Sequence, residues 1–307
     1  MNAANVTALL PAPVTFVTGK GGVGKSTVAG ALAVALARTG LPTALVEFDD
    51  DEAGKRALQG ADVVVDHKVI SYDRALEGAI APLLGGLLVA RTLLRHGAVR
   101  RLVKAMPALR EFVSLEAVRA LVASGKYGRV VVDLPATGHA IDWLRVPGAF
   151  ERFLLGGPLG ALGRRIREEV IAAGRSDLVL VTLAEPLVVR ETEQLVTSLI
   201  RELDRHVALL IVNRSWPRDS PQVLAAAHRL TVTKPDNVDV AAFEKLLIAR
   251  AVAADDTSSA LQAARAMAEA KVLSLPEAPT DPNVLDVLRW LNDGMDRFDL
   301  RDGEVKA

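Results

Sequence analysis

The fold of this chain is decided by the stretch Val14-Thr15-Phe16-Val17-Thr18-Gly19-Lys20-Gly21-Gly22-Val23-Gly24-Lys25-Ser26-Thr27, with the alanine-rich run that continues to Ala37. Its second half matches G-x-x-x-x-G-K-[ST], whose glycines let backbone N–H groups converge on phosphate oxygens at a helix N-terminus. The β-branched run before it is typical of a strand, and the apolar run after it is typical of a buried helix. This context favours a nucleotide phosphate-binding loop over a glycine-rich turn that merely joins a strand to a helix.

The residue types within the loop predict individual roles. Lys25 is expected to neutralise the β- and γ-phosphates, Ser26 to bind a magnesium ion, and Thr27 to reach the α-phosphate. A second lysine near the start, Lys20, indicates a dimer. The expected phosphate-binding residues are Gly19, Lys20, Gly21, Gly22, Val23, Gly24, Lys25, Ser26 and Thr27.

Composition narrows the class of protein. Half of the 307 residues are hydrophobic, which is ample material for a core, and a doubly wound α/β unit of this length is often one domain. Lys plus Arg equals Asp plus Glu at 37 each, so no global field recruits nucleic acid or an anionic membrane. The chain has no cysteine, which excludes disulfides, thiolate zinc sites, iron–sulfur clusters and thiol ligation of arsenic.

The N-terminal residues carry no secretory signature. They lack a basic region followed by a sustained apolar stretch, so we expect residues 1–11 to be a short, loosely ordered lead-in and the protein to be cytoplasmic. The longest uncharged apolar run, residues 78–90, is too short to span a bilayer, and we expect no integral membrane segment.

Strand-like runs alternate with helical patterns along the chain. The expected strands are residues 14–18, 43–48, 129–134, 178–183, 208–213 and 271–275. Such alternation predicts a doubly wound, mostly parallel sheet of the P-loop NTPase type. We expect residues 1–307 to form a single domain, with an inserted helical subdomain from about 68–127 and 140–175, because these intervals exceed an ordinary crossover.

Residues 78–104 within the first interval allow two interpretations. Residues 80–90 are apolar on every face, and a basic stretch from Arg91 to Lys104 follows them. One interpretation is a buried helix followed by a solvated one. The other is an exposed apolar surface with a basic rim that receives a hydrophobic partner helix. Periodicity cannot distinguish them.

Two expected strands end in aspartate. Asp49 follows the second strand, where a carboxylate could orient a hydrolytic water toward the γ-phosphate, although Asp49 and Glu52 are also spaced as a helix capping box. Asp133 ends the strand 129–133, in the pattern that holds magnesium through a water. Gly138, five residues later, could donate a backbone N–H to the γ-phosphate from a loop that moves with that phosphate.

A later strand ends at Asn213. An amide offers a donor and an acceptor together, which suits adenine and opposes guanine, but asparagine is also frequent in turns. The histidines show no spacing of metal ligands, and none is assigned to a metal.

With these motifs in order, the chain resembles the ArsA-type ATPases, the family of arsenite-pump ATPases and of targeting factors for tail-anchored membrane proteins. The deviant Walker A loop with its extra lysine is shared with MinD/ParA and nitrogenase-iron-protein relatives. More specific are Pro107-Ala108-Leu109-Arg110-Glu111, then Tyr127, Asp133, Thr137-Gly138-His139, Leu144 and Pro147, and further along Glu185-Pro186, Glu191-Thr192, Asn213 and Leu275-Pro276.

The resemblance covers nearly the whole chain and implies further roles. Lys20 would reach across a twofold interface to the partner's nucleotide, and Asp49 would be the water-orienting, catalytic aspartate of switch I. Gly138 would belong to switch II, while Asn213 and Pro276 would contact adenine. ATP and magnesium are the implied substrate and metal.

The chain also departs from the family pattern. Where the family has D-P-A-H, it has Asp49-Asp50-Asp51-Glu52, which leaves the register of the catalytic aspartate open. Switch II reads Asp133-Leu134-Pro135-Ala136-Thr137, with its proline shifted by one position, and Asp142 replaces a usual arginine. The missing cysteines exclude a zinc-bridged dimer and arsenite binding.

The leading hypothesis is a dimeric ATPase that couples its nucleotide cycle to a partner, with a hydrophobic protein segment as a candidate. A homodimer and a heterodimer with an ArsA-like homologue both stay open. One alternative is a MinD/ParA-like positioning switch, opposed by the charge balance and by acidic C-terminal residues where MinD-type proteins need a basic anchor. Another is a weakly hydrolysing or non-hydrolysing partner of a second homologue. The acidic residues are Asp293, Asp296, Asp299, Asp302 and Glu304.

Overall fold

The computed structural model describes residues 4–49, 52–104, 106, 108–135, 140–154, 157–217, 229, 238–267, 270–278 and 280–297. The strands are β1 (Val14–Thr18), β2 (Thr43–Phe48), β3 (Asp66–Ile70), β4 (Arg129–Asp133), β5 (Ser176–Leu183), β6 (Leu209–Ser215) and β7 (Lys271–Pro276). The helices are α1 (Ala4–Leu9), α2 (Lys25–Ala37), α3 (Glu52–Ala57), α4 (Tyr72–Ile80), α5 (Leu87–Arg95), α6 (Gly97–Lys104), α7 (Leu109–Ala123), α8 (Ala140–Phe153), α9 (Pro158–Ile166), α10 (Pro186–Leu203), α12 (Val238–Met267) and α13 (Val284–Arg297), with a 3-10 turn η1 (Ala81–Leu83) and a π-helical turn η2 (Arg167–Ile171).

A parallel sheet is the centre of the fold. Within the described residues it has seven strands in the order β3-β2-β4-β1-β5-β6-β7, and every pairing between them is parallel. Strand β1 lies between β4 and β5, so the loop that follows it opens at the carboxyl edge near the middle of the sheet. This arrangement confirms the predicted doubly wound α/β fold of the P-loop NTPase type.

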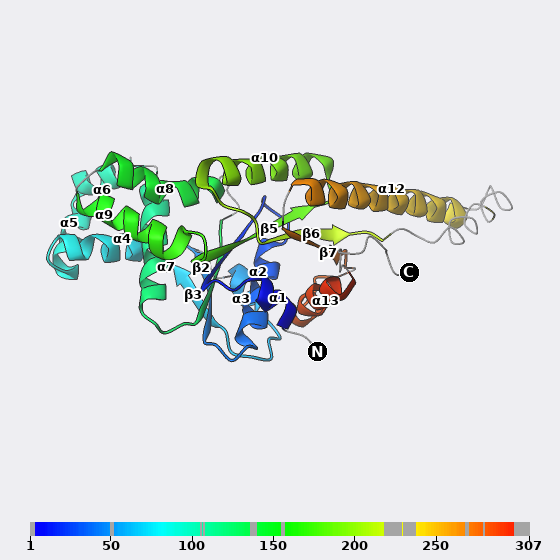
Figure 1. Ribbon diagram of the computed structural model, residues 1–307, viewed down its shortest axis with the longest axis horizontal. Coiled ribbons are helices and arrows are strands. Elements are labelled where there is room, and N and C mark those ends of the chain that lie inside the picture. Colours follow the sequence, from blue (N-terminus) through cyan, green and yellow to red (C-terminus); the bar gives the residue numbers. More distant parts are fainter. Residues whose placement is uncertain are drawn as a thin grey trace.

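Helices cover both faces of the sheet (Figure 1). Alternate strand residues point to opposite faces, so Phe16 and Val132 join the core under α7, α8, α10 and α12. Val17 and Val131 join the core under α1, α2 and α13. Buried on both faces, the strands read as continuous apolar runs, which is why the sequence pattern revealed most of them.

Helix α2 is buried on all sides rather than along one stripe. Every residue from Val28 to Leu36 is buried, and most of them are small, so neighbouring elements can approach closely. A Cβ on Gly30 would lie 2.5 Å from the carbonyl oxygen of Ala57, which shows how tightly α3 packs on α2. The helix that carries the phosphate loop is therefore held from several directions.

The long intervals predicted to be helical contain α4 to α9, which pack against one another at one end of the sheet (Figure 1). The predicted start of the first interval was wrong, because residues 68–70 belong to β3, an edge strand paired with β2. Its apolar stretch is also broken: Gly85 and Gly86 have φ of +81° and +136° between η1 and α5. Whether this helical region is a subdomain in its own right stays a prediction.

The N-terminal residues differ from the expected loose lead-in. They form α1, and Val6 and Leu10 are fully buried against the core that α2 and α13 share. Burial of these two side chains explains why the segment is helical rather than irregular. Among the residues described, no helix combines the length and apolar character needed to cross a bilayer.

Candidate nucleotide-binding site

The phosphate loop is fixed to the neighbouring strands by its glycines and by Asn213. The amide Nδ2 of Asn213, in β6, donates to the carbonyl oxygen of Val23 over 2.9 Å. Gly24, the residue before α2, has φ of +89°, and a Cβ there would lie 2.4 Å from that same amide. Only glycine satisfies both conditions, the left-handed backbone and the close approach.

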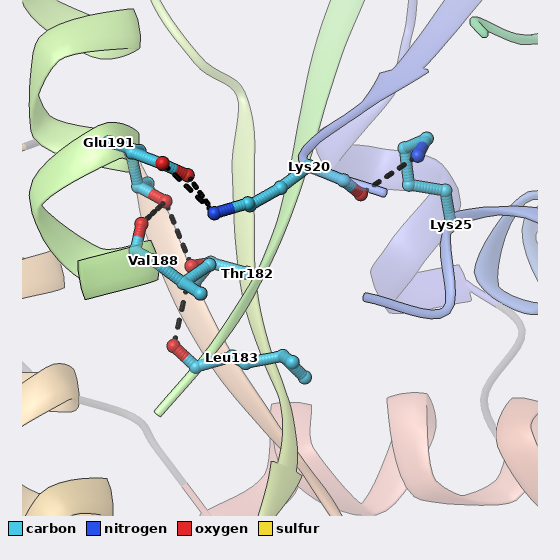
Figure 2. A network of polar contacts seen from close by, with 7 residues as sticks. Lys20, Lys25, Thr182, Leu183, Val188 and Glu191 are labelled. Carbon is cyan, nitrogen blue, oxygen red and sulfur yellow. Dashed lines mark hydrogen bonds and ion pairs between the residues drawn. The ribbon is translucent and has the colours of Figure 1, made fainter. Parts of the chain in front are cut away.

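Lys25, the loop lysine, is buried and turned onto the loop backbone. Its Nζ donates to the carbonyl oxygen of Lys20 over 2.9 Å (Figure 2). Burial lowers the pKa of Lys25, and the nearby carboxylate of Asp133 partly opposes that effect. The cation is therefore held within the phosphate loop, and its role in neutralising phosphate stays a prediction.

Asp133, at the end of β4, lies beside Ser26 and Lys25 of the loop. Its Oδ1 is buried and has no hydrogen-bond partner in the part of the chain that the structure describes. Burial raises the pKa of Asp133 to about 6, and the carboxylate of Glu47 adds to this. A hydrogen bond with Ser26 and the charge of Lys25 act in the opposite direction. The structure thus brings together the two residues predicted for magnesium.

Glu47 is a buried carboxylate near this site that sequence reasoning missed. Its Oε2 accepts from the backbone N–H of Gly54 in α3 over 2.8 Å and lies 2.7 Å from Nε2 of His67. It therefore ties β2 to α3 and β3. The available signal was a single carboxylate inside the apolar run 43–48, two residues before Asp49.

Lys20 extends from the loop toward α10. Its Nζ lies 2.9 Å and 2.8 Å from the two carboxylate oxygens of Glu191, and Figure 2 shows the two side chains pointing toward each other. Both side chains are 43% exposed. Sequence reasoning noted Glu191 only as part of a matching motif and gave it no role.

Asp49 has left-handed backbone geometry, with φ of +63°. Its Oδ1 accepts from the backbone N–H of Tyr72 over 3.1 Å, and its Oδ2 accepts from the guanidinium of Arg110. The preceding Phe48 packs against Trp143 of α8, with ring centroids 4.6 Å apart. The capping-box alternative for Asp49 and Glu52 stays open, since residues 50 and 51 lie outside the described residues.

A pocket opens between the phosphate loop and the ends of β6 and β7. Its lining includes Gly24, Thr27, Asn213, Pro276 and Trp290. Asn213 and Pro276, the residues predicted to contact adenine, thus lie on the same pocket as the end of the phosphate loop. Trp290, from α13, was not anticipated, because nothing near it in the sequence resembles a binding motif. Gly138 lies outside the described residues.

The helical region presents an apolar surface on α5. We call Leu87, Leu88, Val89 and Leu93 the α5 surface; all four are exposed, and Leu88 is 80% exposed. Arg91, Arg95 and Arg101 are exposed nearby. Of the two interpretations of residues 78–104, this exposure favours the apolar surface with a basic rim.

Comparison with known proteins identifies the family. The model of the CobQ/CobB/MinD/ParA nucleotide binding domain matches residues 14–242. The chain belongs to this family. It is also 30% identical to ATPase BagA of Mycobacterium tuberculosis (strain ATCC 25618 / H37Rv) over 233 residues, 69% of this chain and 68% of BagA.

Two eukaryotic relatives match shorter stretches of this nucleotide-binding chain. ATPase GET3A of Arabidopsis thaliana is 28% identical over 139 residues, 45% of this chain and 39% of GET3A. An ATPase ASNA1 homolog of Babesia bovis is 27% identical over 144 residues, 45% of this chain and 40% of the relative. These names support the resemblance to ArsA-type ATPases.

Proposed function

We propose that this protein is a cytoplasmic, ArsA-like ATPase that binds ATP with magnesium, hydrolyses it as a dimer and couples the cycle to a protein partner. The observation that carries the proposal is the cluster of Lys25, Ser26 and Asp133. A buried cation and a buried carboxylate flank a loop of backbone N–H groups at a helix N-terminus, and such a site suits a polyphosphate with a divalent cation.

The residues present fit a magnesium ion. Asp133 has a buried oxygen without a partner among the described residues, and the hydroxyl of Ser26 lies beside the same carboxylate. Oxygen ligands of this kind are those that magnesium takes in nucleotide sites. Ser26 would hold the ion directly and Asp133 through a water, and the ion would neutralise charge on the β- and γ-phosphates.

The remaining predicted residues receive roles in the same proposal. Asp49 orients the attacking water, and Lys20 reaches the nucleotide of the partner subunit once it leaves Glu191. Gly138 contacts the γ-phosphate. Asn213 and Pro276 contact adenine, which is supported by their place on the pocket beside Thr27.

The α5 surface supports a hydrophobic protein segment as the partner. A monomer gains nothing from exposing several large aliphatic side chains on one short helix, and an amphipathic or apolar helix could bury them. Exposed arginines at the rim would favour a segment with acidic flanks.

The enzyme proposal is tested by steady-state ATP hydrolysis with purified protein. Asp49→Asn should abolish turnover while ATP still binds, and Lys20→Ala should impair turnover and ATP-dependent dimerisation together. Sedimentation with a non-hydrolysable ATP analogue reports the dimer. Hydrolysis by Asp49→Asn at the wild-type rate would contradict the role of Asp49 in orienting water. Normal dimerisation by Lys20→Ala would contradict the role of Lys20 across the dimer interface.

The partner proposal is tested with a fluorescent peptide of about 20 Leu and Ala residues carrying acidic flanks, followed by anisotropy. Leu88→Asp should weaken binding about tenfold or more, since it places a charge in an apolar contact. Val64→Asp is the matched control, because Val64 is 91% exposed and precedes the start of β3, whereas α4 and α5 follow the end of that strand. Equal loss in both variants would contradict a specific surface.

A weakly hydrolysing partner of a second homologue is a second candidate. It is favoured by the contacts of Asp49, whose two oxygens accept from Tyr72 and Arg110. ATP binding by the wild-type protein without turnover, alone and at high concentration, would support this candidate over the first.

A further inference from the structure

The carboxylate of Asp49 is held on the side of β2 that faces away from the phosphate loop. In the strand order, β3 lies on one side of β2, while β4 and then β1 lie on the other. The backbone N–H of Asp49 donates to the carbonyl oxygen of Ile70 over 3.1 Å, and its Oδ1 accepts from Tyr72. Both partners follow or end β3.

The donors to this carboxylate come from the N-terminal ends of two helices in the helical region. Tyr72 is the first residue of α4, and Arg110 is the second residue of α7. The guanidinium of Arg110 also lies over the ring of Tyr72, 5.6 Å from its centroid. The hydrogen bond to Asp49 raises the pKa of Arg110, so the cation is retained. Helices α4 and α7 pack on each other, so the two donors form one unit.

The backbone of Asp49 has a conformation that these contacts support. A φ of +63° is unfavourable for a residue with a side chain, and it persists where surrounding contacts impose it. The hydrogen bonds to Ile70, Tyr72 and Arg110 are such contacts. Loss of the donors would let the residue return to a commoner conformation.

We propose that Arg110 and the N–H of Tyr72 are a restraint on Asp49, and that hydrolysis requires its release. Arg110 is thus a positioning residue, which acts on the reaction through Asp49. Any ligand that shifts α4 and α7 would change the rate of hydrolysis without touching the nucleotide. This inference rests on the proposed role of Asp49 in orienting water.

Arg110→Ala tests the restraint through its guanidinium. We expect kcat to rise about two- to five-fold, the range that release of one exposed ion pair allows, with the ATP dissociation constant unchanged. Arg110→Lys should give a kcat between wild type and Arg110→Ala, because it keeps a charge but loses the planar fork. Arg167→Ala is the matched control: Arg167 forms an exposed pair with Glu151 of α8, 2.8 Å apart, and its loss should leave kcat unchanged.

Tyr72→Pro tests the backbone donor separately. Proline is accepted at the first position of a helix, and Ser71 already has the extended backbone, with φ of −82° and ψ of 139°, that a following proline requires. Tyr72→Ala also removes the ring but keeps the backbone N–H that donates to Asp49. The two variants therefore differ in whether this hydrogen bond can form. We expect kcat of Tyr72→Pro to exceed that of Tyr72→Ala by about two- to five-fold.

The outcomes separate this inference from the proposed function. Asp49→Asn combined with Arg110→Ala should be inactive, which would show that the acceleration runs through Asp49. If Asp49→Asn alone hydrolyses ATP normally, the proposed role of Asp49 fails. If Asp49→Asn is inactive but Arg110→Ala is equal to or slower than wild type, the restraint alone is overturned. A rise in kcat for Arg167→Ala equal to that for Arg110→Ala would overturn it as well.

Discussion

Replacing Asp133 with Asn should stabilise the nucleotide-free protein while weakening its use of magnesium. Burial raises the pKa of Asp133 to about 6 from an ordinary value of 3.8. At 1.36 kcal/mol per pH unit, this separation means that ionised Asp133 destabilises the folded state by about 3 kcal/mol. With an unfolding entropy of about 2.1 cal/mol/K per residue, the melting temperature should rise by roughly 5 °C.

The stabilisation by Asp133→Asn should depend on pH, because the folded and unfolded states release the Asp133 proton at different pH values. The folded protein keeps the Asp133 proton up to about pH 6, whereas the unfolded chain releases it near 3.8. Stability contributed by this group therefore falls as pH rises from about 4 to 6, and stays reduced above 6. The gain in the free energy of unfolding from Asp133→Asn should be near zero at pH 4, about half of its full value at pH 5 and constant from pH 6.5 to 8.

Thermal unfolding of both proteins, without nucleotide or magnesium, measures this difference. Asp62→Asn is the control, since Asp62 is exposed and its pKa is lowered by a hydrogen bond with Arg38, so its loss should bring no stabilisation. In parallel, Asp133→Asn should bind ATP with a smaller gain on adding magnesium. An unchanged melting temperature at pH 7.5, or the same gain at every pH, would refute the account of Asp133.

Three further variants probe the loop and its neighbours. Gly24→Ala should weaken ATP binding, measured by calorimetry, about tenfold or more, because φ is +89° and the new Cβ would lie 2.4 Å from Asn213. Binding with wild-type affinity would contradict this. Asn213→Ala should weaken ATP binding about fivefold, because it removes the hydrogen bond to Val23, worth about 1 kcal/mol. It should also reduce the preference for ATP over GTP. Unchanged affinity and unchanged preference would oppose its roles in holding the loop and in contacting adenine. Glu191→Gln should change the free energy of unfolding in urea by less than about 1 kcal/mol, since its pair with Lys20 is exposed; a larger loss would show a structural role for the pair.

Elements that are buried on both faces could be predicted from the sequence. The strands around β1 are apolar throughout, and the loop after β1 matches the glycine and lysine spacing of a phosphate-binding loop. Strand β3 was missed because residues 66–70, Asp-His-Lys-Val-Ile, form an edge strand with half-buried, mostly polar side chains. The helix α1 was missed because its apolar positions, Val6 and Leu9 with the adjoining Leu10, are too few for a periodic signal.

Two predicted site residues near strand ends, Asp133 and Asn213, lie beside the phosphate loop. Asp133 is the last residue of β4 and Asn213 lies near the end of β6, and parallel strands end at one edge of the sheet. Glu47, Glu191 and Arg110 could not be found in the same way. Their partners lie between 7 and 171 residues away in sequence, so each contact depends on packing that no local pattern encodes.

The central place of β1 also governs how the chain can be made. Val14 pairs with Val130 in β4 and with Ser176 in β5, so its nearest strand partner is more than a hundred residues away. At about 5 to 20 residues per second, a ribosome needs on the order of ten seconds to reach β4 after β1. During that time the apolar first strand and the apolar α2 have no sheet to bury them. The protein's contact order is therefore high, and its nascent chain needs protection from aggregation well before a nucleotide can bind.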